Sequence, residues 1–94
     1  MIKSFQDHDT ELLFHGRKPR KLPPDIWRRG TRKLLSLHAA TEISQLRIPP
    51  GNRLEKLKGT RSGQHSIRIN DQWRLCFQWR DGNAYQVEIT DYHS

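Results

Sequence analysis

The sequence predicts an α+β fold in a single domain, residues 1–94, with helices in the N-terminal half and a C-terminal sheet that buries one face. Two observations carry this prediction. Apolar residues alternate through three C-terminal segments, as they do in strands that bury one face. Residues 25–40 instead repeat them at the spacing of an amphipathic helix. A chain of 94 residues is large enough for one core.

The three predicted strands are residues 65–69, 73–79 and 85–90, and turn-forming residues separate them at 70–72 and 81–83. Alternation assigns nine residues to the buried face of the sheet: Ile67, Ile69, Trp73, Leu75, Phe77, Trp79, Tyr85, Val87 and Ile89.

The first turn fixes the pairing of two arginines. If the turn is centred on Asp71, Arg68 lies opposite Arg74 on the polar face. Like charges in such a pair repel and cost up to about 1 kcal/mol without a counter-anion. The pattern therefore indicates either solvent screening or a bound anion.

The second turn is expected to be a loop longer than two residues. Centring it on Gly82 pairs Val87 with Phe77 and Thr90 with Arg74, which preserves the apolar face. A two-residue Asp-Gly turn would break this matching unless a bulge intervened.

The N-terminal half supplies the covering layer. Residues 1–5 are predicted to add an edge strand, residues 7–14 a short helix, and residues 16–24 an exposed basic connector. The helix over residues 25–40 contains Gly30, which costs about 1 kcal/mol relative to alanine. We expect this glycine to mark either close packing or a break in the helix.

A net charge of +7 and a pI near 10.2 favour polyanionic partners, either nucleic acid or an acidic protein. The sequence has neither a transmembrane segment nor a signal peptide, which predicts a cytoplasmic protein without a membrane partner. The single cysteine, Cys76, agrees with a reducing compartment and is predicted to be a half-exposed spacer. Neither a metal nor a cofactor is expected, because the histidine and cysteine spacings do not form a ligand set.

The chain ends in Asp91-Tyr92-His93, a cluster of titratable side chains beside the predicted Arg68–Arg74 pair. Two cations next to acid and base groups are suited to holding and cleaving a phosphodiester.

Residues 54–74 and 87–93 closely resemble the HigB toxins, or plasmid maintenance system killer proteins, of the RelE/ParE superfamily. The resemblance implies the small RelE-like α+β fold, with N-terminal helices packed on a twisted antiparallel sheet. It further implies a ribosome-dependent endoribonuclease that cuts messenger RNA in the 30S decoding site. It also implies neutralisation by a helix-turn-helix antitoxin, HigA, which supplies most contacts to operator DNA.

Carried onto this sequence, the family's catalytic trio falls on Asp91, Tyr92 and His93. The phosphate-binding lysine falls on Lys58 and the strand arginine on Arg74. His93 is then the general acid or base, Asp91 orients it, and Tyr92 stacks on a base or binds the phosphate.

Glu55 departs from the family pattern, because some members have a histidine two residues before the leucine of the Leu-Lys-Gly motif. Glu55 is a candidate general base in place of that histidine. Alternatively it forms an ion pair with Lys56, Lys58 or Arg74. Three further cations are predicted to assist RNA binding: Arg68, Lys56 and Arg61.

Metal-independent cleavage would need a base for the 2′-hydroxyl, an acid for the leaving 5′-oxygen and cations for the phosphate. Two other functions fit the same charge. One is a non-catalytic ParE-like toxin that inhibits DNA gyrase, and the other is a basic nucleic-acid-binding module without chemistry. A catalytic His93 separates the nuclease from both.

Overall fold

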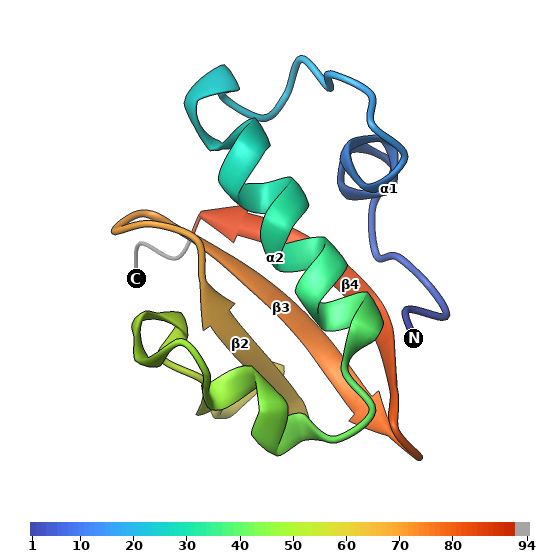
Figure 1. Cartoon of the computed structure of the whole chain (residues 1–94), viewed down its shortest axis with the longest axis vertical. Coiled ribbons are helices and arrows are strands. Elements are labelled where there is room, and N and C mark those ends of the chain that lie inside the picture. Colours follow the sequence, from blue (N-terminus) through green and yellow to red (C-terminus); the bar gives the residue numbers. More distant parts are fainter. Residues whose placement is uncertain (92–94) are drawn as a thin grey trace.

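A computed structural model describes residues 1–91 as two layers, with helices on one face of a four-stranded antiparallel sheet (Figure 1). The helices are α1, His8–Phe14, and α2, Trp27–Ala39. The strands are β1, Glu55–Lys56; β2, Gln64–Arg68; β3, Trp73–Arg80; and β4, Asn83–Asp91. They lie in the order β1-β2-β3-β4, which confirms the predicted α+β architecture.

The N-terminal segment lies along the edge strand β4 (Figure 1). Ile2 forms a parallel bridge with Ala84, and Phe5 forms another with Val87. The predicted edge strand is thus reduced to two isolated bridges, which still cover part of the open edge of β4.

Both helices form where the sequence predicts them. Asp7 caps α1 by accepting a hydrogen bond from the backbone N–H of Thr10 at 3.3 Å. A 3₁₀ turn, Pro24–Ile26, leads directly into α2. A Cβ atom at Gly30 would lie 2.9 Å from Leu13 Cδ2, so the close-packing explanation of this glycine is confirmed.

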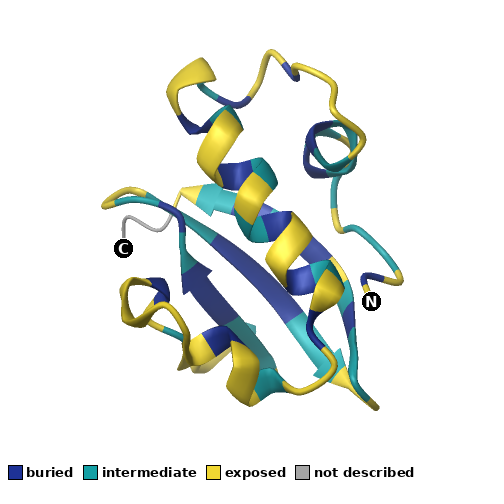
Figure 2. Cartoon of the chain, in the orientation of Figure 1, coloured by how far each residue is buried: buried dark blue, intermediate teal, exposed yellow. Residues whose placement is uncertain are grey.

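The core lies between α2 and the inner face of the sheet (Figure 2). Leu34 and Leu37 of α2 are fully buried, as are Ile67, Leu75 and Phe77 of the strands. Trp73 and Trp79 pack on the edge of this cluster. None of the helices within residues 1–91 has the length and apolarity to cross a bilayer.

The turn between β3 and β4 corrects one prediction. It is a two-residue turn, with Asp81 at φ 50° and Gly82 at φ 76°, rather than the longer loop expected. Both positive angles match a type I′ turn, whose twist suits a hairpin. The predicted alternation is recovered by a bulge, because Gln86, at φ 53°, is an extra residue between Tyr85 and Val87.

The bulge also moves Tyr85 off the buried face. Tyr85 pairs with Gln78, and Ala84 pairs with Trp79 and is fully buried. The prediction that Tyr85 lies on the inner face was therefore wrong, because the register changes by one residue across the bulge. Beyond it the pairing is as predicted, with Thr90 opposite Arg74.

Two 3₁₀ turns, Ile43–Arg47 and Pro50–Asn52, connect α2 to β1, and a third, Gly59–Arg61, lies between β1 and β2. Asn52 is buried in this connection, where its side-chain amide donates to the carbonyl oxygens of Leu46, at 3.1 Å, and Ile48, at 3.4 Å. The segment that leads into β1 is thereby held in place.

Candidate active site

Arg74 lies on the polar face of the sheet near the start of β3, paired with Arg68 on β2 as predicted. Its Nε donates to Ser66 Oγ at 2.8 Å, and its Nη2 donates to the backbone oxygen of Arg53 at 2.7 Å. Its side chain is 13% exposed. These contacts fix the guanidinium group, so that little conformational freedom remains to be lost when an anion binds.

Glu55 lies beside this arginine. It pairs with Ser66 between β1 and β2, and its Oε1 is 3.5 Å from Arg74 Nη2. The predicted ion pair with Arg74 is therefore present. The carboxylate remains 49% exposed, and partly exposed ion pairs of this kind contribute little to stability. The pair can separate at small cost.

A second ion pair covers the middle of the same face. Arg61 Nη1 lies 2.6 Å from Glu88 Oε1 and 3.1 Å from Gln64 Oε1. Arg61 is thus held against the sheet.

Cys76 lies on this polar face, opposite Glu88 on one side and Ser66 on the other. It is fully buried, so the prediction of a half-exposed spacer was wrong. Burial raises the pKa of the Cys76 thiol to about 11. Strand alternation assigned this face correctly but could not show that charged side chains cover it.

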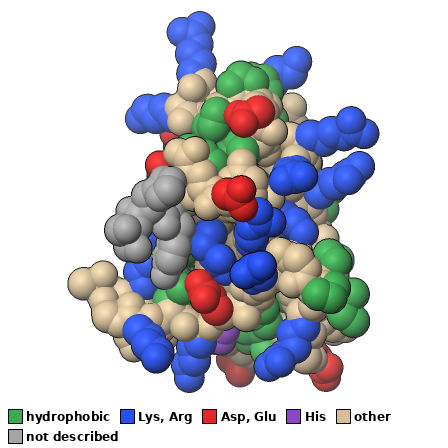
Figure 3. All heavy atoms as spheres, turned by 90° about the vertical axis from the view of Figure 1, so that its left-hand side faces the viewer, with side chains coloured by type: hydrophobic (Ala, Val, Ile, Leu, Met, Phe, Trp, Pro, Cys, Tyr) green, Lys and Arg blue, Asp and Glu red, His purple; other side chains and the backbone are tan. Residues whose placement is uncertain are grey.

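A hollow of about 390 Å³ opens next to Arg74, between the β2–β3 turn and the 3₁₀ turn at residues 50–52. Arg53, Arg68 and Arg74 line it together with Gly51, Asn70 and Asp71. Arg68 forms an ion pair with Asp71. Lys and Arg side chains gather on this side of the molecule (Figure 3), so the hollow has a positive potential.

Asp91 is the last described residue and ends β4 opposite Trp73. Gln72 Nε2 donates to Asp91 Oδ2 at 2.9 Å. Because Thr90 pairs with Arg74, Asp91 lies one residue beyond the arginine pair. Tyr92 and His93, the other members of the predicted trio, lie outside the described residues.

The two predicted lysines lie in or beside β1 and do not line the hollow at Arg74. Lys58 is exposed immediately before the Gly59–Arg61 turn. Lys56 pairs with His65 and is on the face opposite to Glu55, because successive strand residues alternate. Lys56 instead lines a separate hollow of about 200 Å³ with Arg47 and His65, where burial and then Lys56 lower the pKa of His65.

Ser66 and the Arg53 carbonyl were not predicted from the sequence. Ser66 could have been found, because its small hydroxyl side chain occupies the next polar-face position on β2, two residues before Arg68. Arg53 could not, since the contact uses its backbone oxygen and depends on its left-handed conformation, at φ 45°. Within residues 1–91, the structure has no cluster of three or more His, Cys, Asp or Glu side chains able to hold a metal.

The chain matches proteins of known identity along nearly its whole length. The profile of a family described as the RelE-like toxin of type II toxin–antitoxin system HigB matches residues 3–93. Toxin HigB-1 of Vibrio cholerae is 47% identical over 90 residues, which cover 95% of each chain. Endoribonuclease HigB of Proteus vulgaris is 37% identical over 93 residues, covering 99% of this chain and all of that protein.

Two solved structures share the fold. The crystal structure of a YafQ mutant from E. coli has a TM-score of 0.65 and 14% identity, and covers 98% of this chain and 92% of that one. The YoeB–YefM complex from Staphylococcus aureus has a TM-score of 0.60 and 18% identity, and the match covers 100% of this chain and 99% of that one. The profile match and the two HigB relatives show that this chain belongs to the HigB family of RelE-like toxins of type II toxin–antitoxin systems.

Proposed function

We propose that this toxin is an endoribonuclease that cleaves messenger RNA on the ribosome and so inhibits translation. The 37% identity to a protein named Endoribonuclease HigB supports the activity. The observation that carries the proposal is Arg74, which is fixed by Ser66 and Arg53 and faces a hollow that it shares with Arg68. Two guanidinium groups at one opening are suited to binding the oxygens of a phosphodiester.

The reaction requires only groups that protein side chains supply. The substrate's 2′-oxygen attacks the adjacent phosphorus as a base removes its proton, and the bond from phosphorus to the 5′-oxygen breaks as an acid protonates the leaving oxygen. Cyclic phosphate and 5′-hydroxyl ends result. Positioned acid and base groups contribute typically about 10²–10⁴-fold, and Arg74 and Lys58 would stabilise the charge on the phosphate.

In this mechanism His93 is the general acid or base, Asp91 orients it, and Tyr92 stacks on a base or binds the phosphate. Arg68 supports phosphate binding from across the strand pair. Arg61 assists RNA binding beside the site, and Lys56 assists it from the separate hollow that it lines with His65.

Glu55 fits the role of base through its contact with Arg74. A phosphate that binds Arg74 competes with the carboxylate, which lies 3.5 Å away in the free protein. Substrate binding would then release Glu55 from its ion pair at the moment when a base is needed. The same event would transfer Arg74 from a carboxylate to the phosphate.

The partners follow from the same proposal. The ribosome would present messenger RNA to the toxin in its 30S decoding site and help to align the 2′-oxygen for attack. A HigA-like helix-turn-helix antitoxin would neutralise the toxin, and the complex would bind operator DNA through the antitoxin.

Primer extension on a defined messenger RNA, with and without programmed ribosomes, tests the proposal. We expect new cuts with wild-type protein and ribosomes, and their loss in His93→Ala. His8→Ala is the matched control, because His8 is an exposed side chain on α1. Loss of the cuts in Glu55→Ala would support Glu55 as the general base. If folded, toxic protein produces no cuts, the nuclease proposal fails, and inhibition of DNA gyrase becomes the assay for a ParE-like toxin.

A further inference from the structure

A second hollow, of about 410 Å³, continues the first one away from the sheet and toward α2. The two hollows share Arg68 and Gly51. On the far side, three cations of α2 line the second hollow: Arg29, Arg32 and Lys33. The two hollows therefore adjoin, and together they form the basic groove, which extends from Arg74 on the polar face of the sheet to the side of α2 (Figure 3).

The cations of the second hollow lie close enough together to affect one another. Burial, followed by the charges of Arg29 and Arg68, lowers the pKa of Lys33. The lining residues include no carboxylate; besides the cations and Gly51 they are Ser36, Pro49 and Ile69. Arg68 has a carboxylate partner, Asp71, outside this hollow. Like charges gathered in this way are stabilised by a bound anion.

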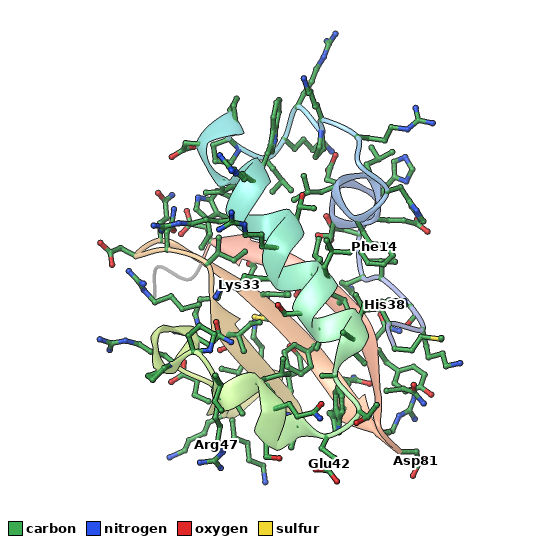
Figure 4. The ribbon with its side chains drawn as sticks, viewed as in Figure 1. Phe14, Lys33, His38, Glu42, Arg47 and Asp81 are labelled. Carbon is green, nitrogen blue, oxygen red and sulfur yellow. The ribbon has the colours of Figure 1, made fainter. Side chains whose placement is uncertain are left out.

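Two of these cations are held in place by neutral partners. Lys33 Nζ donates to Asn52 Oδ1, and Asn52 is itself buried and anchored to Leu46. Arg29 Nη1 donates to the backbone oxygen of Ile69 at 3.4 Å. Figure 4 shows Lys33 leaving α2 toward the side of the molecule on which the groove opens. Neutral acceptors leave both positive charges available to an anion.

We propose that the second hollow binds a backbone phosphate of the substrate RNA, at a linkage other than the one that is cut. The inference rests on the proposed function, because it places the cut linkage at Arg74. A single RNA strand has regularly spaced phosphates and would follow the basic groove. Pro49 and Ile69 offer an apolar wall for the ribose. The hollow therefore sets the path of the RNA strand across the toxin.

The test measures binding of a single-stranded 2′-O-methyl RNA oligonucleotide, which cannot be cleaved, by fluorescence anisotropy over a series of salt concentrations. The double variant Arg29→Gln/Lys33→Gln is compared with Arg17→Gln/Lys18→Gln, which removes the same charge from the exposed connector. We expect roughly tenfold weaker binding for the groove variant and a salt slope smaller by about 0.7, the value for one phosphate contact to a single strand. The control should bind within about twofold of wild type.

A second arm locates the phosphate. Neutral methylphosphonate linkages are placed one at a time along the oligonucleotide. With wild-type protein, one linkage away from the cut position should weaken binding, and this effect should disappear in the groove variant. Lys33→Arg, which keeps the positive charge, should retain the wild-type loss of affinity at that linkage. Thermal unfolding confirms that each variant is folded.

Equal binding by the groove and connector variants would overturn the proposal, as would a methylphosphonate profile that is the same in wild type and groove variant. So would a groove variant that binds RNA normally but loses its affinity for an acidic protein. Because the RNA is uncleavable, the subsite can be confirmed even if primer extension shows no cuts. Conversely, if primer extension shows cuts but the groove variant binds RNA as tightly as wild type, the nuclease proposal holds and the proposed subsite is rejected.

Discussion

The two faces of the sheet are buried to a similar depth by different means. On the inner face, Leu75 and Phe77 are covered by the apolar side of α2. On the outer face, Ser66 and Cys76 are equally inaccessible, yet charged side chains surround them, with Arg74 bonded to Ser66.

The two faces differ in whether a ligand can replace the contacts that their side chains make. Apolar packing is non-directional, and removing a side chain from it costs free energy because apolar surface is exposed or a cavity is left. Arg74 is held by hydrogen bonds to Ser66 and Arg53, and it also forms a long ion pair with Glu55. Phosphate oxygens can replace the carboxylate of that ion pair at similar energy. The inner face therefore maintains the fold, and the outer face can reorganise around a substrate without unfolding the domain.

The largest expected effect comes from removing part of the inner layer. Leu34→Ala, at a fully buried position on α2, should lower the free energy of unfolding by about 2–5 kcal/mol. Leu35→Ala is the matched control, because this neighbouring leucine is 53% exposed and should change stability by less than about 0.5 kcal/mol. Urea titration measures both. Equal losses would contradict the placement of α2 on the sheet.

The next effect comes from the outer face and should appear in activity more than in stability. Arg74→Gln should reduce cleavage by about 10²–10³-fold, as expected for the loss of a charge-stabilising donor, and should cost about 1–3 kcal/mol of stability through unpaired groups. Arg74→Lys keeps the charge but not the forked geometry, and should rescue cleavage only in part.

Arg80→Gln is the control for Arg74, because Arg80 lies at the other end of β3, over the ring of Tyr85. Primer extension on messenger RNA incubated with programmed ribosomes measures the cleavage rates of both variants. If Arg80→Gln reduces cleavage as much as Arg74→Gln, activity depends on the total positive charge of β3 and not on the position of Arg74.

The smallest effect depends on pH. The folded Cys76 thiol keeps its proton up to a pKa of about 11, whereas the unfolded thiol loses it near 9.0. Between these values the unfolded state binds fewer protons, so stability should fall by about 1 kcal/mol per pH unit as pH rises. Below pH 9 the contribution is constant. Cys76→Ala should remove this slope in urea titrations from pH 8 to 10.5, and an unchanged slope would contradict the burial of the thiol.

Much of the site could be predicted because strand alternation is a local property. Parity alone placed Arg68 opposite Arg74 and Thr90 beside them, and the structure has both pairs. The helical spacing of apolar residues in 25–40 likewise predicted one buried side, which the structure shows at Ile26, Leu34 and Leu37. The roles of His93, Tyr92, Asp91 and Lys58 come from the family resemblance and remain predictions.

The features that were missed depend on contacts between distant segments. Cys76 is buried because Arg61 and Glu88, which are 27 residues apart, meet above it. The Asp81-Gly82 turn was rejected because it conflicted with an unbroken register, although its residues favour a two-residue hairpin turn. A bulge satisfies both requirements, and alternation cannot reveal where an extra residue is inserted.

The bulge at Gln86 gives the β3–β4 hairpin tolerance to changes in length. Asp81 lies at the tip of this hairpin, the end away from the β2–β3 turn (Figure 4). On the tip side of the bulge, Ala84 contacts the N-terminal segment, and on the other side Thr90 pairs with Arg74. Gln86, which has no partner on β3, separates the two registers. A change of one residue near the tip can therefore be absorbed at the bulge while Arg74 and Thr90 stay paired.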